Sequence, residues 1–187
     1  MIRGERIFLR PVEQADLAHI VAWRNQPRVL AGLFSYRPIS LAQQEQWFVS
    51  YLNKQDEMLF IIEVNNKTPI GTIGLTRIDF RNQRAEFGRL LIGDEAYLRQ
   101  GYATEATLVL LDYAFSELNL HRVYLEVIAD NEPAVRLYHR CHFQIEGRCR
   151  DAYFSGGKFH DVLVMGILDQ EYYAIRARYT TQVKRVD

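Results

Sequence analysis

The chain has 187 residues, of which 48% are hydrophobic and 12% aromatic, and its 23 Lys and Arg residues balance 23 Asp and Glu residues. This length can bury one substantial core and is short for two ordinary domains, so we predict a single domain over residues 1–187. A net charge near zero provides no basic surface field, which argues against nucleic acid as a partner.

The first part of the chain predicts a strand followed by two helices. Period-two hydrophobicity marks a strand at residues 7–10, and the amphipathic segment after it predicts a helix ending near Arg24. After an irregular stretch, Ser40 and Gln43 have the spacing of a capping box, in which each side chain bonds the other residue's backbone N–H. This box predicts a second helix at residues 41–52. The irregular stretch is the first candidate wall of a substrate pocket.

The rest of the chain supplies most of the predicted sheet. An antiparallel meander is predicted, with strands at residues 58–64, 69–79 and 84–92 and turns at 65–67 and 81–83. A mostly apolar run after Gly101 is too long for a strand and predicts a buried central helix. A strand is predicted at residues 121–128, a helix at 131–140, and a terminal hairpin with strands at 143–154 and 158–167. The tail DQEYYAIRARY is compatible with a final helix. These elements predict an α/β (α+β) fold with one sheet covered by helices on both faces.

Gly101 marks the first candidate for chemistry. It lies in the loop RQGYA, directly before the predicted central helix. Unpaired N–H groups at a helix N-terminus bind anions with the help of the helix dipole. Gly101 and the small Ala103 would let a pyrophosphate approach the backbone closely. The fingerprints G-x-G-x-x-G and G-x-x-x-x-G-K-[ST] are absent, and spacing alone leaves an ordinary glycine turn as the alternative.

Two segments resemble signatures of the GCN5-related N-acetyltransferase (GNAT) family. IGDEAYLRQGYATEA resembles the family's pyrophosphate loop, Q/R-x-x-G-x-G/A, with Gly101 and Ala103 at its last two fixed positions. Leu98 stands where Gln or Arg is usual, and Arg99 where a second glycine is common. NEPAVRLYHRCHF resembles the second signature, N-x-x-A-x-x-x-Y-x-x-x-G-F, with His142 in place of the glycine. The residues in register with this second signature are Asn131, Ala134, Tyr138 and Phe143. The resemblance covers a core at about residues 3–168 and leaves a tail at 169–187.

The resemblance implies how acetyl-CoA would bind. A twisted, mostly antiparallel sheet would splay between the strand ending at Ile92 and the strand at 121–128. The pantetheine arm would enter there as a pseudo-strand, held by the backbone of Leu91 and Ile92. The residues that would hold the cofactor are Leu91, Ile92, Arg99, Gln100, Gly101, Tyr102, Ala103, Thr104, Asn131 and Ala134. Asn131 has an alternative role as N-cap of its own helix. The cofactor supplies the acetyl group, so no metal is expected.

Acetyl transfer also needs a proton donor for the departing thiolate. Tyr138 matches the family's usual donor, and its alternative role is packing of the ring in the core. His139 and His142, three residues apart, would share a helix face, but no third ligand accompanies them and a metal site is not expected.

Glu86 is the candidate general base. A carboxylate among apolar neighbours could deprotonate an ammonium substrate, directly or through water. Strand alternation is expected to place Glu86, Gly88 and Leu90 on one face and Phe87, Arg89 and Leu91 on the other. The alternative role for Glu86 is a solvent-facing charge paired with Arg77 or Arg84.

The acceptor is defined less sharply. Residues that could form its pocket are Trp23, Arg24, Phe34 and Tyr36, although they could equally pack a helix end. The chain resembles the branch of ribosomal-protein N-terminal, spermidine and nucleotide-linked aminosugar acetyltransferases. Polyamine enzymes carry an acidic cluster between the first two helices, whereas LAGLFSYRPISLAQQEQWF has one carboxylate, Glu45, and an Arg-bearing wall would suit a nucleotide diphosphate. We expect an aminosugar or another small amine first, a protein N-terminus next and a polyamine last.

A competing hypothesis is a catalytically silent acyl-CoA-binding module. The departures at Leu98, Arg99 and His142 suggest it, and Tyr138 argues against it.

Location and assembly are predicted from composition. No apolar run approaches the length of a membrane span, and the N-terminus lacks the apolar stretch of a signal peptide. The two cysteines, Cys141 and Cys149, form no CxxC pair, which suits a reducing compartment. The sequence therefore predicts a cytoplasmic protein with no membrane partner, whose tail could join a homodimer interface or dock on its own sheet.

Overall fold

The structure, a computed structural model, describes residues 1–32, 34–35, 37–64 and 67–183. Its strands are β1 Ile2–Arg3, β2 Ile7–Pro11, β3 Met58–Val64, β4 Pro69–Asp79, β5 Arg84–Ile92, β6 Arg122–Ile128, β7 Gln144–Ser155 and β8 Lys158–Leu168. Its helices are α1 Leu17–Arg24, α2 Pro27–Leu30, α3 Leu41–Tyr51, α4 Tyr102–Ser116, α5 Glu132–Arg140 and α6 Asp169–Val183, with short 3-10 helices η1 Gln14–Asp16 and η2 Glu95–Tyr97.

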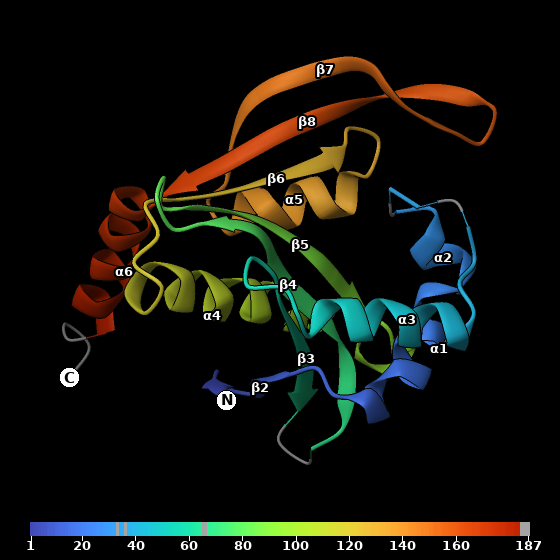
Figure 1. Cartoon of the computed structure of the whole chain (residues 1–187). Helices are drawn as coiled ribbons and strands as arrows, with labels where there is room; N and C mark the ends of the chain where they lie inside the picture. Colours follow the sequence, from blue (N-terminus) through green and yellow to red (C-terminus); the bar gives the residue numbers. More distant parts are fainter. Residues whose placement is uncertain (33, 36, 65–66, 184–187) are drawn as a thin grey trace.

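The strands form one sheet in the order β1-β2-β3-β4-β5-β6-β8-β7 (Figure 1). Neighbouring strands pair antiparallel throughout this order except β5 and β6, which are parallel. The mixed, mostly antiparallel sheet is therefore confirmed. The three meander strands match their predicted bounds, whereas β1 and α2 were not predicted; of the turn at 65–67, residues 65 and 66 lie outside the described residues.

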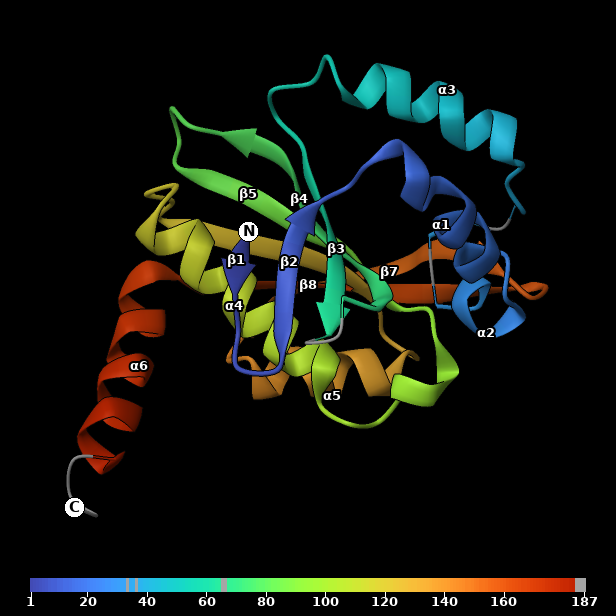
Figure 2. The same cartoon turned by 90° about the horizontal axis from the view of Figure 1, so that it is seen from below.

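Helices cover both faces of the sheet, and the alternation of β3 shows why. Phe60 and Ile62 point into the core cluster that contains buried residues of α4, whereas Leu59 and Ile61 point into a second cluster with residues of α1 and α3. Figure 2 shows α4 and α5 on one side of the sheet and α1 and α3 on the other. Because successive side chains of a strand point to opposite faces, one apolar strand supports both layers.

The only parallel pair among the described strands is also a short one. β5 and β6 are in register at Arg84 with Arg122, Ala85 with Val123 and Glu86 with Tyr124. Beyond these residues the two strands diverge (Figure 1), so the remainder of β5 has no partner strand on this side. The splay that the resemblance implied is confirmed, and it opens a gap between the ends of β5 and β6.

His142 occupies the turn that ends α5, in a left-handed conformation with φ 68°. Its N–H donates to the His139 carbonyl, and the N–H of Phe143 donates to the Tyr138 carbonyl, which closes the helix end. This conformation explains why glycine is usual at this position of the signature. Because α5 ends at Arg140, the expectation that His139 and His142 share a helix face is wrong.

Replacing His142 with glycine is expected to stabilise the fold by about 1 kcal/mol, because glycine adopts this conformation without the steric cost of a side chain. Thermal unfolding should show a midpoint raised by roughly 2–4 °C. His139→Gly, on the exposed helical part of the same segment, is the matched control and should lower the midpoint. An unchanged midpoint in His142→Gly would show that the turn carries no strain.

Candidate active site

A cavity of about 390 Å³ lies where β5 and β6 diverge, between the start of α4 and one face of α5. Nine of the ten residues predicted to hold the cofactor line it, namely Leu91, Ile92, Arg99, Gly101, Tyr102, Ala103, Thr104, Asn131 and Ala134. Gln100 does not, because its side-chain amide donates to the Ala96 carbonyl, and its own carbonyl accepts from Arg6 at 3.1 Å. Lining residues that sequence reasoning missed are Arg28, Val29, Gly32, Leu90, Tyr97, Leu98, Pro133, Leu137 and Arg140.

The N-terminus of α4 faces this cavity through Gly101. Gly101 is the N-cap and has φ 86°, a left-handed conformation that favours glycine. Glu105, in the first turn, would repel a bound anion, but Arg6 holds it through a 2.8 Å contact from Nε and a 2.7 Å contact from its backbone N–H. The Arg6 guanidinium also lies 4.6 Å from the Tyr102 ring centroid. Arg6 therefore neutralises the acidic group closest to the helix N-terminus.

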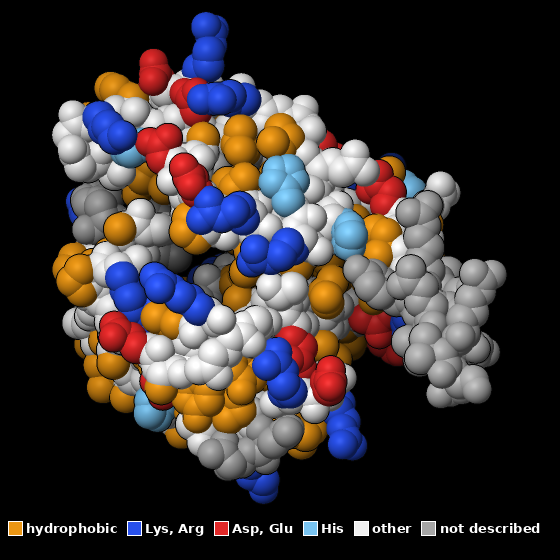
Figure 3. Space-filling model, turned by 180° about the vertical axis from the view of Figure 1, so that it is seen from behind, with side chains coloured by type: hydrophobic (Ala, Val, Ile, Leu, Met, Phe, Trp, Pro, Cys, Tyr) orange, Lys and Arg blue, Asp and Glu red, His pale blue; other side chains and the backbone are white. Residues whose placement is uncertain are grey.

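Three arginines, Arg28, Arg99 and Arg140, line the same cavity. Figure 3 shows Lys and Arg side chains on both sides of a hollow on this face. Arg28 also ties α2 to the end of β5, because its Nη atoms donate to the carbonyls of Ile92 at 3.1 Å and Gly93 at 2.7 Å. Guanidinium groups bind phosphates through paired hydrogen bonds. The cavity thus combines a helix N-terminus, arginines and an unpaired strand edge, which suits a long ligand carrying phosphates.

Asn131 serves α5 and the cavity together. Its Oδ1 accepts from the Ala134 N–H at 3.4 Å, so the predicted N-cap role is confirmed. The same residue lines the cavity, and a Cβ added at Gly32 would lie 3.2 Å from its Nδ2. The side-chain amide is therefore positioned between α5 and the segment after α2.

Tyr138 projects from α5 toward the cavity. Its ring makes edge contacts with Phe87 at 5.9 Å and Phe143 at 5.8 Å between centroids, so the predicted packing role is present. Tyr138 nevertheless remains partly exposed and lines the cavity. Burial raises the pKa of its phenol to about 12. The hydroxyl therefore keeps its proton across the neutral pH range.

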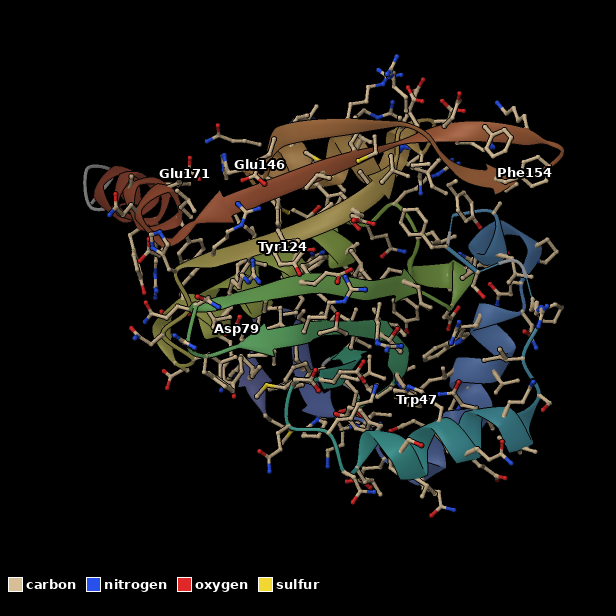
Figure 4. The ribbon with its side chains drawn as sticks, turned by 45° about the horizontal axis from the view of Figure 1, so that its top comes forward. Trp47, Asp79, Tyr124, Glu146, Phe154 and Glu171 are labelled. Carbon is tan, nitrogen blue, oxygen red and sulfur yellow. The ribbon has the colours of Figure 1, made fainter. Side chains whose placement is uncertain are left out.

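Glu86 lies near the start of the splay and does not line the cavity. Arg77 Nη1 is 3.0 Å from Glu86 Oε2, so the predicted pairing is with Arg77, whereas Arg84 pairs with Asp79 at 3.6 Å. Burial raises the pKa of Glu86 despite the opposing charge of Arg77. Glu86 is therefore a half-buried, ion-paired carboxylate opposite Tyr124, whose side chain Figure 4 shows between β5 and β6.

A β-bulge corrects the expected faces of β5. Arg89 has φ 53°, and the pairing with β4 slips between the partners of Thr72 and Gly74. Leu90 therefore packs with the same core cluster as Phe87, whereas Leu91 packs with Trp23 on the opposite face. An extra residue in one strand reverses the alternation beyond it. The expectation that Leu90 shares a face with Glu86 is wrong for this reason.

A second cavity, of about 200 Å³, lies on the face of α1 and α3. Its lining residues are Ile20, Arg24, Phe34, Ser35, Gln44, Trp47, Leu59, Thr72, Arg89 and Leu91. Two predicted acceptor residues, Arg24 and Phe34, are among them, and Figure 4 shows Trp47 between α3 and the sheet. Leu91 lines both cavities, so they are neighbours at the splayed end of β5.

Trp23 lines neither cavity and packs in the core. It is 6% exposed, and a Cβ added at Gly93 would lie 2.0 Å from its Cγ. Gly93 therefore accommodates the indole, and Trp23 fulfils the alternative role of packing a helix end. Tyr36, the remaining predicted acceptor residue, lies outside the described residues.

The family model described as an acetyltransferase (GNAT) domain matches residues 6–144. The chain belongs to the GNAT acetyltransferase family. It is 32% identical to spermidine N(1)-acetyltransferase of Vibrio cholerae over 90% of this chain and 96% of the relative, and 30% identical to the Escherichia coli K12 protein of the same name over 93% and 92%. A solved Vibrio cholerae spermidine N-acetyltransferase, in complex with CoA and spermine, matches this acetyltransferase with a TM-score of 0.85 at 30% identity, covering 91% of this chain and 99% of that one.

The family membership makes this protein an N-acetyltransferase that takes its acetyl group from acetyl-CoA. Across the described ranges, no group of three or more His, Cys, Asp or Glu side chains is arranged to hold a metal ion in this acetyltransferase. None of the helices in the described ranges is long and apolar enough to cross a membrane.

Proposed function

We propose that the two cavities form one active site, with the acetyl donor in the larger cavity and a small-molecule amine in the smaller one. The observation that carries this assignment is that Leu91, at the splayed end of β5, lines both. A donor lying along the unpaired edge of β5 would direct its reactive end toward Leu91, where the cavities are neighbours.

The donor cavity fits the groups of acetyl-CoA. The N–H groups at the start of α4 and the guanidinium groups of Arg99 and Arg140 would hold its phosphates. The backbone at Leu91 and Ile92 would hold the pantetheine arm, with the Ile92 carbonyl already accepting one hydrogen bond from Arg28. When bound, acetyl-CoA supplies an acetyl thioester whose sulfur leaves as a thiolate. Tyr138 would donate its phenolic proton from Oη to that sulfur.

We assign Glu86 as the base that removes the amine proton. It lies at the start of the splay and lines neither cavity, so a water molecule would have to relay the proton. A base must be ionised to accept a proton, so the rate should fall as the pH drops through the pKa of Glu86. Because that pKa is raised, this acidic limb should lie at higher pH than for an ordinary carboxylate.

Replacing Glu86 with glutamine is expected to lower turnover and remove that acidic limb. Arg77→Gln is the matched control: it removes the charge that lowers the pKa of Glu86, so the limb should move to higher pH while turnover at high pH is retained. The measurement is kcat/KM from pH 5 to 9 with one amine. A Glu86→Gln enzyme that keeps the wild-type profile would make Glu86 structural.

The acceptor class we favour is a small amine such as a nucleotide-linked aminosugar. The arginine side chains of the smaller cavity support it, since they suit a phosphate-bearing molecule. A polyamine is the second candidate because similar proteins are named spermidine N(1)-acetyltransferases, and a protein N-terminus is the third. A thiol-release assay with acetyl-CoA and one amine of each class tests the proposal. Donor binding without thiol release from any amine would favour the silent acyl-CoA-binding module.

We also infer a homo-oligomer in the cytoplasm. A Vibrio cholerae spermidine N-acetyltransferase has a structure described as dodecameric, which supports assembly without specifying the dimer predicted from the tail. Tyr172 of α6 donates to Asp112 of α4 at 2.8 Å, so the start of this tail docks on its own chain.

The free cysteines Cys141 and Cys149 support the cytoplasmic location.

A further inference from the structure

The smaller cavity contains two guanidinium groups, and none of its described lining residues is an Asp or Glu. Arg24 reaches it from the last turn of α1, and Arg89 reaches it from the bulge in β5. Burial and the charge of Arg89 both lower the pKa of Arg24. Two cations therefore face one small space, an arrangement that is unfavourable until an anion enters it.

The two arginines differ in how their charge is balanced. Arg89 Nη2 lies 3.0 Å from Glu57 Oε1, and its guanidinium lies 5.3 Å from the Trp47 ring centroid. Arg24 makes no hydrogen bond, ion pair or ring contact with any residue in the described ranges 1–32, 34–35, 37–64 and 67–183. The partial negative charge at the end of α1 favours a cation there but supplies no hydrogen-bond partner inside the cavity.

The acids nearest to this region are already engaged or point elsewhere. Glu57 is contacted by Arg89 and also by Lys54 at 3.2 Å. Glu45, on α3, is exposed and does not line the cavity. A polycation entering here would meet two like charges, of which only that of Arg89 is offset by a carboxylate, Glu57. An anionic group would instead meet Arg24, which has no partner among the described residues.

We propose that the acceptor is a small amine that also carries an anionic group, a phosphate or a carboxylate, and that Arg24 binds this group. The inference rests on the proposed function and deepens it, since it names the chemistry that the smaller cavity selects. Arg89 adds a second positive charge while staying anchored to Glu57. With its anionic group held by Arg24, the acceptor would extend its amine toward Leu91, where the smaller cavity borders the donor cavity.

Matched amines test this selectivity. kcat/KM is measured by thiol release with ethanolamine, O-phosphoethanolamine and β-alanine, with glucosamine and glucosamine 6-phosphate, and with spermidine. The wild-type enzyme should prefer an anionic amine to its neutral partner, and the better of the phosphate and the carboxylate identifies the anion. Arg24→Gln should reduce the preference by roughly 10- to 150-fold, the value of a hydrogen bond to a charged group. Arg24→Lys should retain part of it.

Two controls separate this result from general effects. Arg136→Gln removes the same charge from the exposed face of α5, where Arg136 pairs with Glu132, and should leave the preference unchanged. Thermal unfolding and the Kd for CoA should be unaltered in Arg24→Gln. Equal use of neutral and anionic amines by the wild type, preference for spermidine, or an unchanged preference in Arg24→Gln would overturn the inference.

Failure of the proposed function is distinguishable from failure of this inference. If no amine releases thiol, the acceptor assignment fails, and anion binding is then measured by calorimetry with O-phosphoethanolamine and CoA-loaded protein. Binding that is lost in Arg24→Gln and retained in Arg136→Gln would support the anion site without catalysis. Absence of binding, or equal binding by Arg24→Gln, would overturn it.

Discussion

Replacing Tyr138 with phenylalanine is expected to lower kcat by roughly 10²- to 10⁴-fold, or about 3 to 5 kcal/mol of barrier, while the affinity for acetyl-CoA changes little. The substitution keeps the ring that packs against Phe87 and Phe143 and removes only the hydroxyl. The measured quantities are single-turnover and steady-state rates, because a slow product-release step would mask the effect on kcat.

The size of this effect depends on the pKa values of donor and acceptor. A free thiol has a pKa of about 8.5, well below the value of about 12 to which burial raises the pKa of Tyr138. Desolvation in the cavity would also raise the pKa of the departing thiol, because burial disfavours its charged form. This shift acts in the direction that reduces the opposition to proton transfer from the phenol.

Tyr113→Phe is the matched control for Tyr138→Phe. Tyr113 lies on α4 with its ring against Phe60 and lines neither cavity, so loss of its hydroxyl should leave both rates unchanged. If folded Tyr138→Phe enzyme retains the wild-type single-turnover rate, Tyr138 only packs, and water protonates the thiolate.

Replacing Gly101 with glutamate is expected to weaken acetyl-CoA binding by about 100-fold or more. The new carboxylate would lie at the N-terminus of α4 beside the bound phosphates, and two unit charges about 4 Å apart near a protein surface interact by about 4 kcal/mol. Calorimetry of CoA binding to the folded variant measures the loss. Unchanged affinity would remove the phosphates from this helix end.

Gly101→Ala separates strain from charge in this experiment. The φ of 86° at Gly101 disfavours any side chain, at a cost of about 1–2 kcal/mol. A Cβ there would lie in ordinary contact, 3.4 Å from Arg6 Nη2, so the alanine variant should fold with a slightly lower melting temperature. It should lose less than about tenfold in affinity. An equal loss in both variants would assign the effect to backbone strain.

The sequence determines the elements and the glycine loop before α4 because their signals are local. Ser40 and Gln43 form the predicted capping box through both of its hydrogen bonds, and a box of this kind spans only four residues. Gly101 adopts the left-handed N-cap conformation directly before α4, as the strand–glycine–helix order suggested. The helix that carries Tyr138 begins at the N-cap Asn131, another local signal, and Tyr138 lines the larger cavity.

Only the tertiary structure decides which side chains meet around these elements. The bulge at Arg89 depends on the pairing of β5 with β4 and reverses the faces that simple alternation predicts for Leu90 and Leu91. Arg6 reaches Glu105 across 99 positions of the chain, a contact that no local pattern encodes. Arg24 and Arg89 line the same cavity only because α1 packs on the face of the sheet that also carries α3. Local hydrogen bonding and periodicity specify the elements, whereas the charge of the smaller cavity arises from the packing of segments distant in sequence.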